Sequence, residues 1–283
     1  YSGFLSGCTS LEKIHVPAHL LEAYKLDSYF KNYSSMIVGD ATDDYTGWTT
    51  ISQPFTLSYN RMAGSPNIIL KNSTSLEVKG EVAQSFGNVV SYGHTSYDYS
   101  STDYKWGNKD WSKIINTCDN VSITGTLEHK IQTYKGKWYF FCLPFDFKVG
   151  DIVTENNIKY AIRYYDGYNR ATVTTNNWKN YTADDIVPAG TGFILQTSAT
   201  AWVTFKAQDN ASKQNVMSNS AFTKALADND SETAANKGWN LVGNPWQSYY
   251  NIHKLNYTAP ISVWNGSTYV AYSLTDDDYA IRR

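Results

Sequence analysis

The residues of this chain best suited to chemistry are aromatic side chains that stand among polar neighbours. The sequence holds 23 Tyr and 9 Trp, whereas charged residues make up only 18% of it. Tyr and Trp combine a large rigid face with a polar tip, which suits contact with sugar rings or with other proteins. The candidate ligand-binding residues lie in the polar stretch 91–111 and around two expected hairpin turns: Tyr97, Tyr99, Tyr104, Trp106, Tyr165, Tyr168 and Trp264.

A structural role competes with this binding role. Aromatic residues that flank a hairpin turn commonly pair across the two strands, which is the alternative for Tyr165, Tyr168 and Trp264. A binding surface would instead require exposed aromatic faces. Trp138 and Trp239 stand in apolar runs, and we expect both of them in the core.

Glycoside hydrolysis is the natural enzymatic hypothesis for an aromatic-rich surface protein, and it requires paired carboxylates. Most of the candidate carboxylates lie in turn-rich stretches, where Asp usually caps the backbone. They are Asp98, Asp103, Asp110, Asp166, Asp184 and Asp185. The sequence carries no signature of a nucleotide-binding protein, a zinc protease or a serine hydrolase. We therefore expect no catalytic residues, and a glycoside hydrolase is the least favoured alternative.

Patterns for metal and cofactor binding are weak. The five His residues are scattered, and His15 and His19 straddle Pro17, so one regular helix face cannot present both. Asp276, Asp277 and Asp278 could bind calcium, although a solvated turn is the simpler interpretation. We expect no metal site and no cofactor.

Charge and hydropathy exclude two classes of partner. The net charge is -2, and Lys and Arg are scattered without a basic stripe, so nucleic acid binding is not expected. No apolar stretch approaches the roughly 20 residues that span a bilayer. We expect Cys8, Cys118 and Cys142 to be small buried hydrophobic residues, with a bridge between Cys118 and Cys142 as the alternative.

An internal repeat organises the second half of the chain. Trp138 to Pro144 has a counterpart in Trp239 to Pro245, with Trp and Pro six residues apart both times. Each tract leads to an expected hairpin, whose type I′ turn would be Asp166-Gly167 in the first copy and Asn265-Gly266 in the second. The copies span 131–205 and 236–283. The second stops before its closing strand, so we expect this chain to be part of a longer one.

Between the ends, short apolar or alternating runs separated by turns predict strands, as in Phe55 to Tyr59 and Val121 to Thr124. The stretch 91–111 is expected to be a long loop, and Ala221 to Ala227 to form one or two helical turns. Residues 45–130 could form a sandwich of their own, pair with the repeats or continue a solenoid.

The first 34 residues carry a resemblance to a known family. From Leu5 to Pro17 an apolar residue or proline stands at every third position, which suits one coil of a solenoid. The segment Ser6 to Pro17 resembles a BspA-like leucine-rich repeat, and Leu20 to Tyr33 resembles the short helical ending of such arrays. We expect a capping helix from Ala18 to Tyr24 and a linker near residues 34–45.

A second resemblance covers roughly residues 135–283. The motifs Gly136 to Asp146, Ala189 to Phe193 and Gly238 to Pro245 resemble a module appended to large surface proteins of Bacteroides-type bacteria. This resemblance implies an extracellular or outer-membrane surface location, with adhesion or glycan handling as the role. It implies no assigned catalytic residues.

Together these observations predict a mainly β protein: a terminal leucine-rich repeat coil with a short capping helix (1–34), a β-rich domain (45–130) and a β-sandwich-like domain with two repeat copies (131–283). The predicted function is non-enzymatic adhesion or scaffolding through protein-protein interaction. The alternative is a carbohydrate-binding module of a polysaccharide-utilising bacterium. The expected partner is a host or bacterial surface protein or glycan.

Overall fold

Strands make up 40% of the structure and helices 14%, which confirms the expected mainly β class. The computed structural model describes residues 5, 10–17, 20–40, 48–57, 62, 64–71, 74–79, 84–96, 108–116, 121–173, 175–209, 213, 221–247, 250–264, 268–275 and 280–281. Two short α-helices lie in this part, α1 (Leu21–Leu26) and α2 (Gly167–Thr172).

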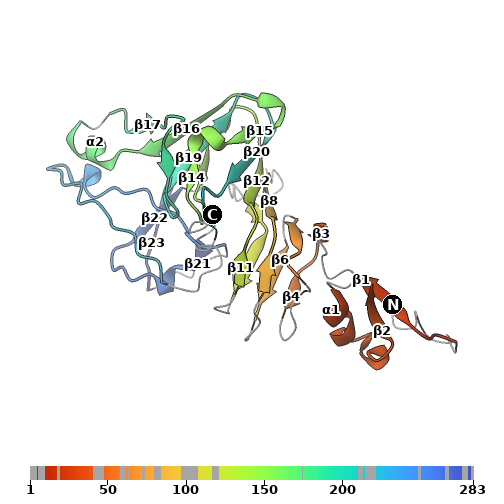
Figure 1. The fold of residues 1–283 in the computed structure, drawn as a ribbon. Coiled ribbons are helices and arrows are strands. Elements are labelled where there is room, and N and C mark those ends of the chain that lie inside the picture. The colour runs from red at the N-terminus through yellow and green to blue at the C-terminus, as the bar shows by residue number, and fades with distance from the viewer. Residues whose placement is uncertain are drawn as a thin grey trace.

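The strands between residues 48 and 133 form a parallel β-solenoid, because each turn of the chain lays its strands beside those of the preceding turn (Figure 1). This is one of the arrangements that the sequence left open. The three parallel stacks are β3 (Trp48–Ile51), β5 (Asn67–Leu70), β8 (Val89–Ser96) and β12 (Leu127–Thr133); β4 (Phe55–Leu57), β6 (Ser75–Val78) and β10 (Lys113–Asn116); and β7 (Gln84–Phe86) and β11 (Val121–Ile123).

Alternating side chains explain how these short strands share one interior. In β6 and β12 every second residue is buried, as the two-residue period of a strand requires. The parallel register aligns Ile51 with Leu70, Leu70 with Ser91, and Ser91 with His129. This row of aligned, inward-facing side chains therefore changes from aliphatic residues in β3 and β5 to polar residues in β8 and β12.

Asparagine side chains join successive coils at one corner. Asn67 accepts a hydrogen bond from the backbone N-H of Asn88 at 2.7 Å, and Asn88 accepts one from the backbone N-H of Thr126 at 2.7 Å. Gly87 and Gly125 stand beside these amides, where a Cβ atom would meet the Asn67 and Asn88 side chains. The corner therefore needs Gly for space and Asn for hydrogen bonding.

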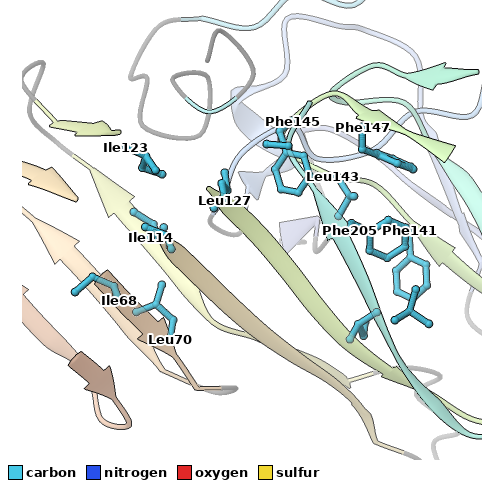
Figure 2. Close-up of a cluster of buried hydrophobic side chains, with 14 of the residues drawn as sticks. Ile68, Leu70, Ile114, Ile123, Leu127, Phe141, Leu143, Phe145, Phe147 and Phe205 are labelled. Carbon is cyan, nitrogen blue, oxygen red and sulfur yellow. The ribbon is translucent and has the colours of Figure 1, made fainter. Parts of the chain in front are cut away.

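The first sheet continues from the solenoid into the repeat region. β12 pairs antiparallel with β20 (Ala201–Lys206), which pairs in turn with β15 (Val153–Thr154). Buried side chains from Ile51 to Ala207 form one cluster across both parts, and Figure 2 shows Ile68 and Leu70 of the coils in the same cluster as Phe141 and Phe205. The expected boundary between residues 130 and 131 thus falls inside β12.

The rest of the first repeat copy builds a smaller sheet in the order β13-β19-β16-β17, with β14 and β18 paired beside it. Phe147 and Phe205 pack edge to face at 5.2 Å between ring centroids, and Phe193 lies 5.3 Å from Phe147. The elements are β13 (Tyr139–Phe141), β14 (Phe147–Lys148), β16 (Tyr160–Tyr165), β17 (Trp178–Asn180), β18 (Ile186–Val187), β19 (Phe193–Thr197) and the 3-10 turns η3 (Val149–Asp151) and η4 (Glu155–Asn157).

The second copy follows the same order of elements as far as β18: a short strand, a 3-10 turn, two antiparallel strands and a last short strand that pairs with the first. β21 pairs with β24, as β14 pairs with β18. The elements are β21 (Tyr250–Asn251), η6 (Ile252–Lys254), β22 (Ile261–Trp264), β23 (Tyr269–Tyr272) and β24 (Ala280–Ile281), preceded by η5 (Ala234–Asn236).

The three motifs behind the second resemblance meet at the contact between the two copies. The backbone N-H of Gly190 donates to Leu143, and that of Gly243 donates to Gly190, both at 3.1 Å. The Cys142 thiol, which is buried, contacts the Asn244 carbonyl oxygen at 3.4 Å. A Cβ atom on Gly243 would overlap Cys142, so this glycine is explained by close packing.

At the amino-terminal end, β1 (Ile14–Pro17) and β2 (Ile37–Asp40) pair in parallel, with α1 and η2 (Lys31–Tyr33) between them in the chain (Figure 1). The linker expected at 34–45 is therefore wrong for residues 37–40, where the apolar Ile37 and Val38 form a strand. None of the helices described here is long and apolar enough to cross a membrane.

Three local expectations are corrected by the structure. The loop expected at 91–111 begins and ends in strands, because β8 runs to Ser96 and pairs antiparallel with β9 (Asn108–Trp111). Residues 221–227 are irregular and exposed instead of helical, since a helix of one or two turns is marginal in water. Asp166 does not begin a type I′ turn but caps α2, accepting from the backbone N-H of Asn169 at 2.8 Å.

The second hairpin exists, but its loop is longer than expected. β22 and β23 pair antiparallel, with Trp264 opposite Tyr269. This register leaves four residues between the strands, whereas a type I′ turn has two at its centre. Residues 265–267, which include the expected Asn265-Gly266 turn, lie outside the described part of the chain.

Candidate functional site

A cluster of four aromatic side chains around one arginine joins the two repeat copies beside α2. We call this set the Arg170 cluster: Tyr165 at the end of β16, Arg170 in α2, Trp178 in β17, Trp239 near the start of the second copy and Tyr269 in β23. Capping by Asp166 starts the helix directly after Tyr165, and this puts Arg170 within reach of both copies.

Arg170 lies at the centre of the cluster. Its Nη1 donates to the Tyr165 hydroxyl at 3.1 Å, and its Nη2 donates to the Ala235 carbonyl at 3.1 Å. The guanidinium carbon lies 4.6 Å from the centroid of the Trp239 ring, a cation-π distance. Tyr269 and Trp239 pack edge to face with ring centroids 5.4 Å apart, and Trp178 and Tyr165 pack in the same way at 5.1 Å.

The cluster is open to solvent on one side. Tyr269 is 44% exposed, and Tyr165, Arg170, Trp178 and Trp239 are half-buried. Burial raises the pKa of Tyr269. Nearby Tyr165 raises this pKa further, whereas Arg170 lowers it in part. The Tyr269 hydroxyl is therefore neutral at physiological pH and leaves the charge of Arg170 uncompensated.

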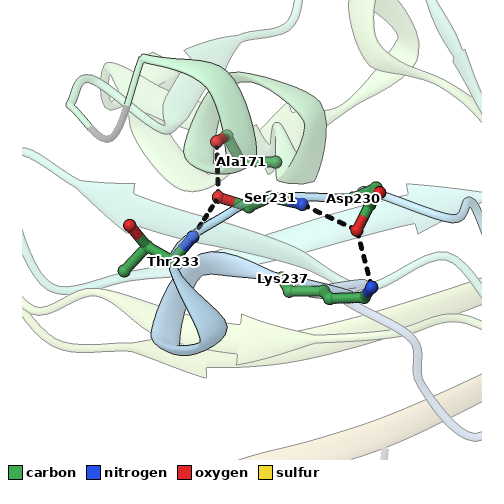
Figure 3. Close-up of polar contacts among 5 residues, drawn as sticks. All are labelled: Ala171, Asp230, Ser231, Thr233 and Lys237. Atoms are coloured by element: carbon green, nitrogen blue, oxygen red, sulfur yellow. Dashed lines mark hydrogen bonds and ion pairs between the residues drawn. The ribbon is translucent and has the colours of Figure 1, made fainter.

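The segment 229–239 is held against α2 by polar contacts (Figure 3). The Ser231 hydroxyl donates to the Ala171 carbonyl at 2.9 Å and accepts from the backbone N-H of Thr233 at 3.3 Å. Asp230 and Lys237 form an ion pair at 2.6 Å across the base of the segment. These contacts fix the Ala235 carbonyl where Arg170 binds it.

Gly167 allows this close approach. A Cβ atom at Gly167 would overlap the Trp239 carbonyl oxygen and the Asn229 side chain. Asn229, which is buried, donates through Nδ2 to that same carbonyl at 2.7 Å. In the Asp-Gly pair of the sequence, Asp166 thus caps the helix, and Gly167 permits the close contact with Trp239 and Asn229.

The structure brings together only part of the set predicted from sequence. Tyr165 belongs to the Arg170 cluster, whereas Tyr168 is 70% exposed on α2 and has no described contact with the cluster. Trp264 contributes through its backbone, which pairs with Tyr269. The remaining candidates, Tyr97, Tyr99, Tyr104 and Trp106, lie outside the described residues.

Sequence reasoning missed the other four members of the cluster. The expectation that Trp138 and Trp239 are core residues is wrong, because both are half-buried and each lies beneath an arginine. Arg163 lies 4.8 Å from the Trp138 ring centroid. Each arginine is distant in sequence from its tryptophan, so no local pattern signals these pairs.

The aspartates proposed for hydrolysis serve structural roles where they are described. Asp185 accepts from the backbone N-H and the hydroxyl of Thr182, and these hydrogen bonds lower the pKa of Asp185. Asp184 forms an ion pair with Lys148 at 3.2 Å. Asp110 lies in β9, while Asp98 and Asp103 are outside the described residues.

A Ser-His pair lies among the described residues, and it is buried away from solvent. His129 Nδ1 lies 2.5 Å from the Ser91 hydroxyl, and its Nε2 lies 2.8 Å from Gln247 Oε1. Gln247 Nε2 donates back to Ser91 at 3.2 Å. All three side chains are at most 1% exposed, so no substrate can reach the hydroxyl.

Metal ligands do not gather within the described residues: no group of three or more His, Cys, Asp or Glu side chains is placed to hold an ion. The Asp276 to Asp278 run lies outside that part, as do Cys8 and Cys118. No family model, curated protein or solved structure matches this chain.

Proposed function

We propose that this chain is a non-enzymatic adhesion or scaffold protein, exported to the extracellular space or the outer-membrane surface. In this proposal its β modules present the Arg170 cluster to a protein or glycan of a host or bacterial surface. The observation that carries the proposal is the cluster itself: an arginine without a carboxylate partner among the described residues, set among half-exposed aromatic rings.

The composition of the cluster supports a binding role. Trp, Tyr and Arg dominate the residues that carry most of the energy at protein interfaces. Here they are fixed in advance by the Asp166 cap, the Asn229 hydrogen bond and the Ser231 contacts. A surface that is already ordered loses less conformational entropy on binding.

Catalysis finds less support in the described residues. The Ser91-His129 pair is buried, Asp166 and Asp185 accept from backbone N-H groups, and Asp184 pairs with Lys148. Glycoside hydrolysis would need two facing carboxyl groups separated by about 5 to 10 Å. A hydrolase is therefore the least favoured of the three candidates.

The architecture of the proposed protein rests on the sequence motifs. In it residues 1–34 are the last coil and cap of a leucine-rich repeat array, and residues 131–283 are paired β-sandwich-like repeat modules. The solenoid between them would act as a spacer that holds the modules away from the array.

A carbohydrate-binding module is the second candidate, and the exposure of Tyr269 favours it. A half-exposed tyrosine ring beside polar donors is a common platform for a sugar ring. In this case the partner on the target surface is a glycan and not a protein.

Adhesion of protein-coated fluorescent beads to cultured epithelial cells tests the proposal. We expect wild-type beads to adhere, and Tyr269→Ala beads to adhere several-fold less. Tyr257→Ala is the matched control, because Tyr257 is 47% exposed and has no described contact with the cluster. Equal adhesion of the wild-type and Tyr269→Ala beads would exclude this surface.

The same assay separates the two candidates. Protease treatment of the cells should abolish adhesion if the partner is a protein. Periodate oxidation, which cleaves vicinal diols of sugars, should abolish it if the partner is a glycan. Absence of wild-type adhesion to epithelial and bacterial cells alike would contradict both.

A further inference from the structure

The guanidinium of Arg170 has hydrogen-bonding capacity that the protein does not use. Guanidinium carries five N-H donors. One donates to Tyr165, one donates to Ala235, and the Nε-H is buried without a hydrogen-bond partner in the described structure. Each of Nη1 and Nη2 therefore keeps a second N-H, and both belong to a half-exposed side chain.

The charge of Arg170 also has no counter-ion in the part of the chain that the structure describes. Its two acceptors are a neutral phenol and a backbone carbonyl, and the remaining contact is the face of Trp239. Asp230, one of the acidic residues on the neighbouring segment, forms an ion pair with Lys237. No ion pair of Arg170 occurs among the described residues.

We infer that the Arg170 cluster binds a carboxylate-bearing sugar of a glycan, such as a sialic or uronic acid. The unused N-H groups on Nη1 and Nη2 can donate to the oxygens of a carboxylate, and hydrogen bonds to a charged acceptor are stronger than those to a neutral one. The exposed side of Tyr269 offers an apolar face to the attached sugar ring. This inference rests on the proposed adhesive function and names the chemistry of its partner.

The surroundings favour a sugar over an acidic protein segment. A stable protein interface buries about 800 Å² per partner around an apolar centre. The segment 229–239 lines one side of the cluster, and its exposed residues include Glu232, Thr233, Ala234, Ala235 and Lys237, which are charged, polar or small. Such a surface suits a small ligand that binds through two contacts, a charged one with Arg170 and an apolar one with the Tyr269 ring.

The test is a glycan array that contains matched acidic and neutral glycans, including sialyllactose beside lactose and oligogalacturonate beside galactan. We expect the wild-type chain to bind acidic members and to bind neutral counterparts at least about tenfold less, because the charge-assisted bonds are missing. Methyl esterification of the bound glycans should abolish the signal, and this arm does not depend on any variant folding.

Two variants locate the site. Arg170→Gln should lose at least about tenfold in acidic glycan binding, while Arg170→Lys keeps the charge and should retain part of it. Arg163→Gln is the control, because Arg163 lies over Trp138 at a similar distance but donates to Asn180. Near-ultraviolet circular dichroism verifies that each variant is folded.

The outcomes separate this inference from the proposed function. Binding to acidic and neutral glycans alike, or binding that survives esterification or Arg170→Gln, would overturn the carboxylate inference alone. Binding to sulfated glycans without carboxylates at equal strength would show general anion attraction and overturn it too. If no glycan binds while beads still adhere through the cluster, the partner is a protein, and the adhesive function stands.

Discussion

Gln247 completes a closed set of hydrogen bonds in the interior. Its Oε1 accepts from His129 Nε2, so His129 Nδ1 accepts from the Ser91 hydroxyl, and Ser91 in turn accepts from Gln247 Nε2. This assignment holds for a neutral imidazole. The triangle joins β8, β12 and the second repeat copy at a point where an unmet polar group would be costly.

Replacing Gln247 should therefore destabilise the whole fold. Gln247→Met keeps the side-chain length but leaves His129 Nε2 and Ser91 short of a partner, and we expect a loss of about 1 to 3 kcal/mol in the free energy of unfolding. Urea denaturation measures it. Gln53→Met, at an exposed position, serves as the control and should change little. An unchanged midpoint in Gln247→Met would show that the triangle does not matter for stability.

Tyr181 gives a pH-dependent prediction. A tyrosine usually has a pKa of about 10, but burial, with Tyr164 and Asp185 nearby, raises the pKa of Tyr181 to about 12. The folded state holds this proton more tightly than the unfolded state. Its contribution to stability is thus complete below pH about 10 and falls as pH rises from about 10 to about 12.

Substitution of Tyr181 should reduce this loss. The folded and unfolded pKa values imply a cost of about 1 kcal/mol at pH about 11 after allowance for partial exposure. Between pH about 9 and about 11, the free energy of unfolding should fall by about 1 kcal/mol less in Tyr181→Phe than in wild type. Urea denaturation at both pH values measures this difference. Tyr257→Phe should follow the wild type. Parallel loss in Tyr181→Phe and wild type would refute the assignment.

At the level of elements, strand positions could be predicted but their pairing could not. Apolar or alternating runs predicted β4 and β11, because inward residues of a strand need a two-residue period whatever the partner strand. Parallel pairing depends on corners, and the Asn67 and Asn88 bonds that align them span about twenty residues or more. Local sequence does not reveal such contacts.

The same limit explains the errors around α2. Asp-Gly favours a hairpin turn, but Asp also caps helices, and the choice here depends on the close contact of Gly167 with Trp239. Tyr165 could be proposed from its position in the repeat. Arg170 could not, because its role requires Ala235 and Trp239 to come from a distant segment.

The Asn corner leads to a double-mutant prediction. In Gly125→Ala the new Cβ would overlap Asn88 Oδ1 and come within 2.8 Å of the Asn88 backbone nitrogen. We expect a loss of about 1 to 3 kcal/mol in the free energy of unfolding. Asn88→Ala should lose about 1 to 2 kcal/mol, because it removes the acceptor of the Thr126 N-H and hydroxyl.

The pair should not be additive. Removal of the Asn88 amide relieves the side-chain part of the clash. The double variant Asn88→Ala/Gly125→Ala should therefore lose less free energy of unfolding than the two single variants lose in sum, by at least about 0.5 kcal/mol. Urea denaturation of all four proteins gives this coupling energy. Additive losses would mean that the two residues do not share the corner in solution.

At the scale of the whole molecule, the solenoid and the first repeat copy depend on each other. The sheet passes from β8 through β12 to β20 without interruption, and one cluster of buried side chains fills both parts. The last coil of a solenoid must cover its interior. Here β20 and the Phe145 and Phe205 side chains lie where a further coil would stack.

This shared core predicts one cooperative unfolding transition for residues 48–207. Ile68→Ala in the coils and Phe193→Ala in the repeat should each destabilise this same transition. We expect each to lower its free energy of unfolding by about 2 to 5 kcal/mol, because both side chains are completely buried in one cluster. Hydrogen exchange followed by mass spectrometry can measure protection in β5 and β19 separately. In each variant, protection should fall by similar amounts in both strands, since neither part can open alone. Loss confined to the mutated part would instead make the solenoid and the repeat independent domains that merely share an edge.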